Sequence, residues 1–314
     1  MQHFKNLTEC ITYFQDERTC WDYFEKMRWE GSPVCPHCGS TQVYRLSNYK
    51  QFKCGNKATC DKKFTALVGT MFENTKIPLQ KWFAALYLCT AHKKGISSIQ
   101  LAKDLGLTQK TGWFLFQRIR EMMLNGMGIT LRNVVQVDET YIKGKRSNKS
   151  KRIRKLIAEG KMEDKESIVL GMIETGKSVV FKHVTSAEAD SLAPVIKATV
   201  PDEGAIIVTD GHQSYVEIGT TYSSHMVVNH SIEEYVNEQG FTTNSIENAF
   251  SLLKRGIYGI YHHVSGKHLQ RYCNEFSYRF NNRSIKDYER FTLTMEKKQL
   301  EGRLTYKRLI AKNA

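Results

Sequence analysis

The sequence predicts a multidomain α/β protein in which a small cysteine-rich module and a helical unit precede a larger α/β domain. The larger domain is expected to have a mixed five-stranded sheet flanked by helices. Three observations support this prediction. Four cysteines lie within 26 residues, from position 35 to position 60. A helical spacing of apolar residues follows over residues 78–126, and short β-rich segments alternate with helical ones over residues 132–285.

The composition argues against a disordered or a membrane-spanning chain. Of the 314 residues, 41% are apolar, which is enough for packed cores. No run approaches 18 consecutive apolar residues, so no membrane partner is expected. The N-terminal residues lack the apolar segment of a signal peptide. We therefore expect a cytoplasmic protein whose cysteines are thiols or metal ligands.

The formal net charge of +14 is unevenly distributed along the chain. Residues 31–131 contain 14 basic and four acidic side chains, and residues 251–314 contain 14 and five. Residues 156–250 instead contain five basic and 15 acidic side chains. A basic front and back around an acidic middle favour a polyanionic partner, although many basic chains are merely soluble.

Four cysteines have the spacing of a zinc site: Cys35, Cys38, Cys54 and Cys60. A pair two residues apart can hold one ion, and a hairpin over residues 41–46 and 49–53 would deliver the second pair. We therefore predict a zinc ribbon over residues 31–72 with one structural Zn²⁺, after an N-terminal helical segment over residues 1–30. The second pair is separated by five residues instead of two. A three-cysteine site completed by His37, or reduced thiols, thus remain alternatives.

Residues 78–126 predict a helix-turn-helix unit. A helix over 79–92 is followed by one over 98–105, which Ser97 opens, and by a third helix that ends near residue 124. In this layout the first turn of the later helix enters the major groove of DNA. An ordinary three-helix packing unit is the alternative. The expected DNA contacts are Gln109, Lys110, Thr111, Gln117 and Arg118.

Three acidic residues follow one another on predicted strands and a helix. Asp138 and Asp210 end two β-rich segments, and Glu247 shares a helix face with Lys254, seven residues later. Carboxylates on rigid elements can hold two Mg²⁺ ions, which prefer oxygen ligands and act on phosphoryl groups. Singly, each acid also fits a strand-end turn or a solvated helix face.

As a set, the motifs resemble those of a DDE-type insertion-sequence transposase with an N-terminal zinc ribbon and an RNase H-like (ISXO2-like) catalytic domain. The resemblance spans roughly residues 20–285. It implies an RNase H-like domain over residues 132–285 and leaves a basic C-terminal tail over residues 286–314. The segments with this resemblance are Cys35–Cys38, Gly69–Phe72, Val137–Tyr141, Thr209–Gly211, Thr243–Ile257 and Tyr278–Arg283.

The resemblance also implies roles for individual residues. Asp138, Asp210 and Glu247 would bind two Mg²⁺ (or Mn²⁺) ions, with Lys254 as a further catalytic residue. Some relatives use Asn as the third residue, which makes Asn248 a weaker candidate. Eight of the thirteen residues from 143 to 155 are basic, and this segment is either a DNA-binding loop or a solvated surface loop. The further DNA contacts predicted are Lys143, Lys145, Arg146, Lys151, Arg152 and Arg255.

The implied function is that of a DNA transposase. It would bind the terminal inverted repeats of its element and catalyse metal-dependent strand cleavage and strand transfer. Its partners would be double-stranded DNA, of the repeats and of the target, and further copies of itself, as a homodimer or larger homo-oligomer at the nucleoid of a prokaryotic cytosol. The alternatives are a DNA-binding regulator on an inactive nuclease scaffold and a metal-dependent nuclease that does not join strands.

Overall fold

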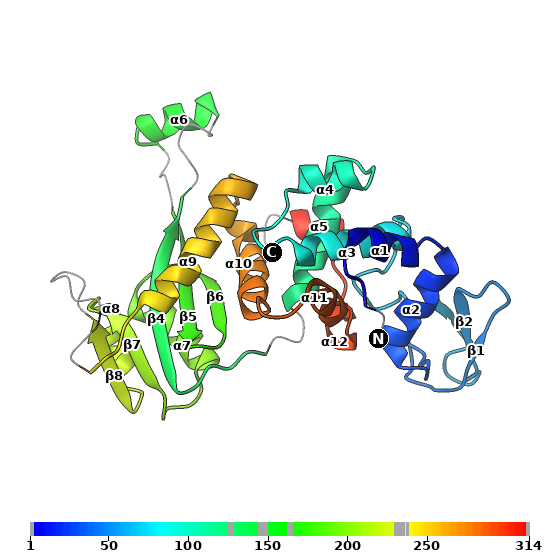
Figure 1. Cartoon of the computed structure of the whole chain (residues 1–314), viewed down its shortest axis with the longest axis horizontal. Helices are drawn as coiled ribbons and strands as arrows, with labels where there is room; N and C mark the ends of the chain where they lie inside the picture. Colours follow the sequence, from blue (N-terminus) through cyan, green and yellow to red (C-terminus); the bar gives the residue numbers. More distant parts are fainter. Residues whose placement is uncertain are drawn as a thin grey trace. The chain divides into compact units, whose positions relative to one another are not determined.

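The computed structural model describes residues 3–124, 128–143, 150–161, 166–228, 236 and 239–311. These residues form two compact units (Figure 1). The first unit comprises residues Met1–Met127 and Ser284–Ala314, and the second comprises Gly128–Arg283. No helix within the described ranges is both long and apolar enough to cross a membrane.

The first unit begins with two short helices and a small antiparallel sheet. Asn6 and Asp16 cap the two helices by accepting hydrogen bonds from the backbone N–H groups of Glu9 and Thr19. The sheet has the order β1-β2-β3, and its third strand was absent from the prediction, because three residues are too few to show an alternating pattern. The elements are α1 (Leu7–Tyr13), α2 (Glu17–Trp29), β1 (Val43–Arg45), β2 (Gln51–Cys54) and β3 (Lys63–Thr65).

Three further helices follow where the apolar spacing predicts them. The Ser97 hydroxyl accepts a hydrogen bond from the backbone N–H of Gln100 at 3.1 Å, as expected for a helix N-cap. Gly112 allows the last two of these helices to approach closely, because a Cβ there would lie 2.8 Å from the Cβ of Ala102. The helices are α3 (Leu79–Ala91), α4 (Ser98–Asp104) and α5 (Gln109–Leu124).

The C-terminal segment belongs to the first unit and is helical, which differs from the expected basic tail. Phe291 is fully buried in an aromatic cluster and lies 6.0 Å from Phe14 and 6.2 Å from Phe83, measured between ring centroids. The neighbouring Arg290 donates a hydrogen bond to the carbonyl oxygen of Thr90 at 3.1 Å. These long-range contacts order the segment into α11 (Asp287–Thr294), α12 (Lys297–Leu300) and α13 (Tyr306–Ile310).

The second unit is built on the predicted mixed five-stranded sheet, with the order β6-β5-β4-β7-β8. The first three strands of this unit in sequence, β4 to β6, are antiparallel neighbours. β7 and β8 then add in parallel on the other side of β4. The strands are β4 (Val134–Ile142), β5 (Ser167–Glu174), β6 (Val179–Val184), β7 (Ile206–Asp210) and β8 (Ser224–Val228).

Strand β4 is longer than the sequence indicated. The prediction ended it at Asp138, whereas the structure continues it to Ile142 and pairs it with β5 from Val135 to Ile142. The buried strand β5 offers a partner along this whole length, so two polar residues in β4 do not end it. Asp138 therefore lies inside a strand, whereas Asp210 is the last residue of β7, as expected. The basic helix α6 (Lys151–Ala158) lies in the connection from β4 to β5.

Helices cover both faces of the sheet. On one face, side chains of α7 and α8 form a core cluster with alternate residues of β4, β5 and β7, such as Val135 and Val137. On the other face, α9 and α10 pack against the intervening residues, such as Val169 and Ile173 of β5. The helices are α7 (Ala189–Thr199), α8 (Ser214–Gly219), α9 (Asn244–Gly256), the π-helical turn η3 (Ile257–Tyr261) and α10 (Gly266–Asn281).

Two glycines bring α9 close to its neighbours. A Cβ on Gly171 of β5 would lie 2.6 Å from Phe250 and 2.7 Å from Ile246, both on α9. A Cβ on Gly256, at the end of α9, would overlap the ring of Phe276 on α10. Both glycines are therefore required by packing, because the helix could not lie at this depth above a larger residue.

We predict that Gly256→Ala destabilises the second unit. Gly256 has ordinary helical φ and ψ, so alanine alone would favour the helix by up to about 1 kcal/mol. Overlap with the fully buried ring of Phe276 outweighs this gain and makes the net change in stability unfavourable, because overpacking of this kind costs about 1–3 kcal/mol. Urea unfolding of the full chain measures the difference. Gly259→Ala is the matched control, since its Cβ would meet no atom within 4 Å, and equal stability of the two variants would contradict the packing argument.

Candidate functional site

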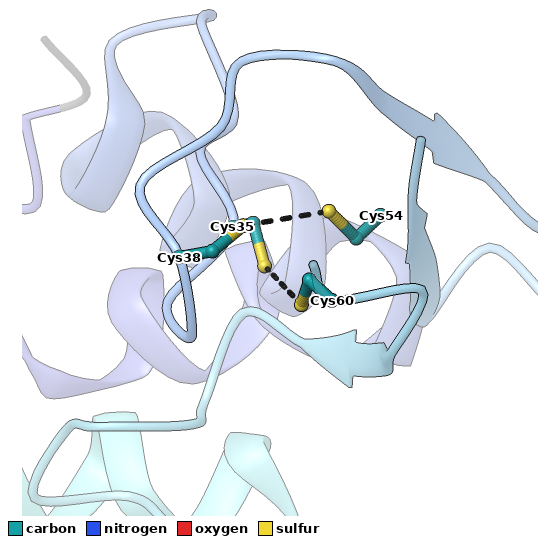
Figure 2. A group of neighbouring side chains, drawn as sticks. All are labelled: Cys35, Cys38, Cys54 and Cys60. Atoms are coloured by element: carbon teal, nitrogen blue, oxygen red, sulfur yellow. Dashed lines mark hydrogen bonds between the residues drawn. The ribbon is translucent and has the colours of Figure 1, made fainter. Parts of the chain in front are cut away.

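The four predicted cysteine ligands come together in the first unit (Figure 2). Their sulfur atoms all lie within 4.8 Å of one another. The Sγ atoms of Cys35 and Cys60 are 3.7 Å apart, and those of Cys38 and Cys54 are 3.6 Å apart. Four thiolates at the usual Zn–S distance of about 2.3 Å in a tetrahedron would be about 3.8 Å apart. The cluster therefore has the size of a four-cysteine zinc site.

The backbone around Cys35 favours the thiolate that a metal needs. Burial alone would raise the pKa of Cys35, but hydrogen bonds from the backbone N–H groups of His37 and Cys38 help lower this pKa to about 7. Gly39 has a φ of +74°, which is the left-handed conformation required by the tight turn after Cys38. Local backbone geometry thus prepares the first pair of ligands.

The wide spacing of the second cysteine pair does not keep Cys60 out of the cluster. Residues 56–60 form a turn between β2 and β3, and this turn brings Cys60 back toward Cys54 at the end of β2. His37 is not among the clustered ligand groups of the described residues. Of the arrangements left open by the sequence, the four-cysteine site fits the structure.

The first two predicted acids extend from neighbouring strands of the second unit. The last registered pair between the parallel strands β4 and β7 is Gln136 with Val208. Two more residues along each strand lead to Asp138 and Asp210. Because side chains alternate with a period of two, both carboxylates lie on the sheet face of Gln136.

The third acid, Glu247, lies above this same face, in the first turn of α9. The side-chain oxygen of Gln136, which is 2% exposed, accepts a hydrogen bond from the backbone N–H of Ile246 at 3.1 Å. This bond ties the start of α9 to β4, two residues before Asp138. The buried Thr243 hydroxyl also donates to the Glu247 carboxylate at 3.3 Å. Gln136 and Thr243 were not among the predicted site residues, since a lone glutamine or threonine has no distinctive sequence pattern.

The acids influence one another electrostatically. Burial raises the pKa of Asp138, and the nearby negative charges of Asp210, Glu139 and Glu247 raise it further, to about 7. The backbone N–H of Glu139 partly opposes this by donating to the Asp138 carboxylate at 2.8 Å. The arrangement thus concentrates negative charge and carboxylate oxygens, the ligands that Mg²⁺ prefers.

The acids are nevertheless less tightly gathered than the cysteines. Among the described residues, the group whose ligand atoms are close enough to hold a metal ion is the four-cysteine cluster. Glu247 is exposed, and Asp138 and Asp210 are partly exposed. Lys254 lies two turns after Glu247 and is partly buried, whereas Asn248 is exposed. Asp138, Asp210 and Glu247 are called the acidic site below.

The side chain of Glu139 lies on the face of β4 opposite to that of Asp138 and contacts α8 there. Its carboxylate accepts a hydrogen bond from the hydroxyl of Tyr215 on α8, and Tyr215 is 1% exposed. Burial and the neighbouring Glu139 both raise the pKa of Tyr215 above its usual value, so the phenol remains a proton donor. This pair fastens α8 to the strand that contains Asp138.

The predicted DNA-contact residues divide into exposed and buried ones. Gln117 and Arg118 are buried in the first unit, and Arg118 donates to the carbonyl oxygens of Leu304 and Glu73. The C-terminal segment covers this part of α5, so neither side chain is available for DNA. Lys143 pairs with Glu166 at 2.8 Å, and Lys145 and Arg146 lie outside the described residues. Exposed or partly exposed residues are Gln109, Lys110, Thr111, Lys151, Arg152 and Arg255.

We predict that Cys60→Ala removes the zinc ion. Metal analysis of the purified full chain should show about one zinc per protein, and the variant should lose most of it, because three thiolates leave the tetrahedron incomplete. His37→Ala and Cys89→Ala are the matched controls, since neither residue belongs to the clustered group. Retention of zinc by Cys60→Ala together with its loss from His37→Ala would contradict the four-cysteine assignment.

Comparisons with known proteins agree with this arrangement. Residues 15–63 match the transposase zinc-ribbon domain, and residues 130–281 match the ISXO2-like transposase domain. The chain is also 29% identical over 283 residues to an uncharacterized protein in the transposable element ISH50 of Halobacterium salinarum. That similarity covers 86% of this chain and 92% of the relative.

The two matched domains contain the structural features that the sequence predicts. The zinc-ribbon match includes all four clustered cysteines, and the second match includes Asp138, Asp210 and Glu247 with the whole five-stranded sheet. The chain therefore combines a segment that matches the transposase zinc-ribbon domain with one that matches the ISXO2-like transposase domain, and along most of its length it is similar to a protein of a transposable element.

Proposed function

We propose that this protein binds the terminal inverted repeats of its element and catalyses metal-dependent cleavage and transfer of DNA strands. The observation that supports this most directly is the common sheet face of the three acids. Asp138 and Asp210 extend from β4 and β7, and Gln136 holds the first turn of α9, with Glu247, above them. Three carboxylates on three rigid elements form a suitable frame for phosphoryl transfer.

The proposed chemistry has two steps at phosphorus. In the first, water attacks a phosphodiester at the element end, and the 3′ oxygen leaves as a hydroxyl. In the second, this 3′-hydroxyl attacks a phosphodiester of the target DNA, and the target's own 3′ oxygen leaves. Two Mg²⁺ (or Mn²⁺) ions held by Asp138, Asp210 and Glu247 would stabilise the attacking and leaving oxygens.

The remaining residues of the site are assigned supporting roles. Thr243 orients Glu247 through its hydroxyl, and Gln136 is a positioning residue that acts through the backbone of α9. Lys254, two turns along the same helix, is proposed to contact a substrate phosphate. A covalent protein–DNA intermediate is not part of this proposal, since water and the 3′-hydroxyl supply the nucleophiles.

The first unit is proposed to recognise the element ends. Gln109 and Lys110 are exposed, and Thr111 is partly exposed, in the first turn of α5, the part of a recognition helix that reads bases in the major groove. The exposed, positively charged side chains of Lys151 and Arg152 on α6 are suited to binding the phosphates of the DNA backbone. Two element ends must be joined to one target, so we propose a homodimer or larger assembly on DNA, acting at the nucleoid in a prokaryotic cytosol.

We predict that Asp138→Ala, Asp210→Ala and Glu247→Ala each abolish both cleavage and strand transfer. Each change removes carboxylate ligands, and we expect rates at least about 10²–10³-fold lower, the scale seen when one charge-stabilising group is lost. Labelled element ends incubated with target DNA and Mg²⁺ report both products.

Asn248→Ala is the matched control, because Asn248 is the exposed neighbour of Glu247 and should leave the rates unchanged. An active Glu247→Ala with an inactive Asn248→Ala would transfer the role to Asn248. If the wild type cleaves DNA but does not join strands, a nuclease is favoured. If the wild type binds the element ends but cleaves no strand, a DNA-binding regulator is favoured.

We predict that Gln136→Met raises the Mg²⁺ concentration needed for half-maximal activity. The variant keeps about the same side-chain volume and removes the β4 acceptor for the Ile246 N–H, which then retains only the neighbouring carbonyl oxygen of Thr243, so the start of α9 with Glu247 is held less firmly on β4. Loss of such a supporting bond typically weakens metal binding by about 10–100-fold. Activity measured over a range of Mg²⁺ concentrations shows the shift.

Gln270→Met is the control for a purely structural effect. Gln270 also links a helix to a strand. Its side chain accepts a hydrogen bond from the His183 N–H at 2.8 Å and donates one to the carbonyl oxygen of Phe181. It joins α10 to β6, however, and not α9 to β4. Each variant should lose about 1–3 kcal/mol of stability, and Gln270→Met should lose at least as much as Gln136→Met because Gln270 forms more hydrogen bonds. A Mg²⁺ requirement that is unchanged in Gln136→Met, or equally raised in both, would show that Gln136 does not position Glu247.

A further inference from the structure

The C-terminal helix α13 lies against the first turns of α5. The ring of Tyr306 meets the ring of Phe114 edge to face, with centroids 5.6 Å apart. The ammonium group of Lys110, a predicted DNA-contact residue, lies 4.7 Å from the centroid of the same Tyr306 ring. One aromatic side chain thus joins the end of the chain to the helix expected to enter the major groove.

The segment that contains Tyr306 is firmly attached to the first unit. Leu304 and Leu309 are buried, at 3% and 0% exposure. The guanidinium of Arg118 donates to the carbonyl oxygen of Leu304 at 3.1 Å, and the Gly302 N–H donates to Gly69 at 3.1 Å. α13 therefore has a defined position beside α5.

This segment presents positive charge to solvent. After Glu301 the chain contains four basic residues and no acidic one. Two of them, Lys307 and Arg308, directly follow Tyr306 and are exposed. Neither forms an ion pair with any residue in the described part of the chain. Within the described ranges, therefore, no carboxylate neutralises these two charges.

We propose that Lys307 and Arg308 form, with Lys110, one continuous surface that binds the phosphates of duplex DNA beside the groove entered by α5. This inference rests on the proposed DNA-binding function and adds the C-terminal helix to it. The segment lies outside both matched domains, which end at residues 63 and 281. Lys307 and Arg308 adjoin Tyr306, whose ring contacts α5. By binding phosphates they can therefore fix the position of α5 along the duplex without contacting any base.

The experiment measures binding of the full-length protein to two labelled duplexes, one with an element end and one of unrelated sequence, over a range of salt concentrations. Each phosphate contact contributes about 0.9 to the slope of log affinity against log salt. The double variant Lys307→Gln/Arg308→Gln should therefore lower the slope by about 1.8. Its affinity should fall by the same factor on both duplexes, because phosphates have no base identity.

Lys297→Gln/Lys298→Gln is the matched control, because it removes two exposed charges from α12 of the same unit. A slope change equal to that of the control would overturn the inference, and so would tighter binding, which would show that α13 obstructs α5. Lys110→Gln tests the proposed function separately. If Lys110→Gln weakens binding and the α13 variant does not, only this inference fails, whereas a wild type without salt-dependent DNA binding contradicts both.

Discussion

The close packing of α9 against the sheet is the constraint on which the acidic site depends. A helix and a strand can share metal ligands only if their backbones lie near each other, since Mg–O bonds are about 2.1 Å long. Gly171 permits this approach, because its missing side chain leaves room for Ile246 and Phe250 beside the strand of Asp138. Gln136 then fixes the distance between β4 and the first turn of α9, because its side-chain oxygen accepts a hydrogen bond from the backbone N–H of Ile246. Packing and hydrogen bonding together decide where the carboxylate of Glu247 lies.

The same closeness has an electrostatic cost. Burial and three neighbouring acids raise the pKa of Asp138 to about 7, so its ionised form is disfavoured in the protein alone. Such perturbed groups are concentrated at functional sites, where a ligand of opposite charge offsets the repulsion. Elsewhere in the unit a buried carboxylate is fully paired instead: Glu275 forms an ion pair with Arg279 at 2.6 Å and accepts a hydrogen bond from the hydroxyl of Tyr261.

The first unit is stabilised in two different ways. The ribbon has a very small core, in which Phe52 and Phe64 stack with ring centroids 5.7 Å apart beside the four cysteines, so a metal ion is needed for much of its stability. The helices instead share an aromatic cluster that includes Phe291 from the far end of the chain. The C-terminal segment contacts both parts, since the Met71 N–H donates to the carbonyl oxygen of Leu300 at 2.9 Å.

Local periodicity and ligand spacing were enough to predict the mixed sheet, the helices with clear apolar spacing and a metal site at Cys35 and Cys38, but they left the part of Cys60 in that site open. The sequence also identified Asp138, Asp210 and Glu247 as candidates, since acids on successive rigid elements form a pattern. Long-range packing, in contrast, sets the continuation of β4 past Asp138, the burial of Arg118 and the place of the last helices in the first unit. Those outcomes depend on contacts between residues far apart in the chain, such as Arg118 with Leu304, and no local pattern encodes them.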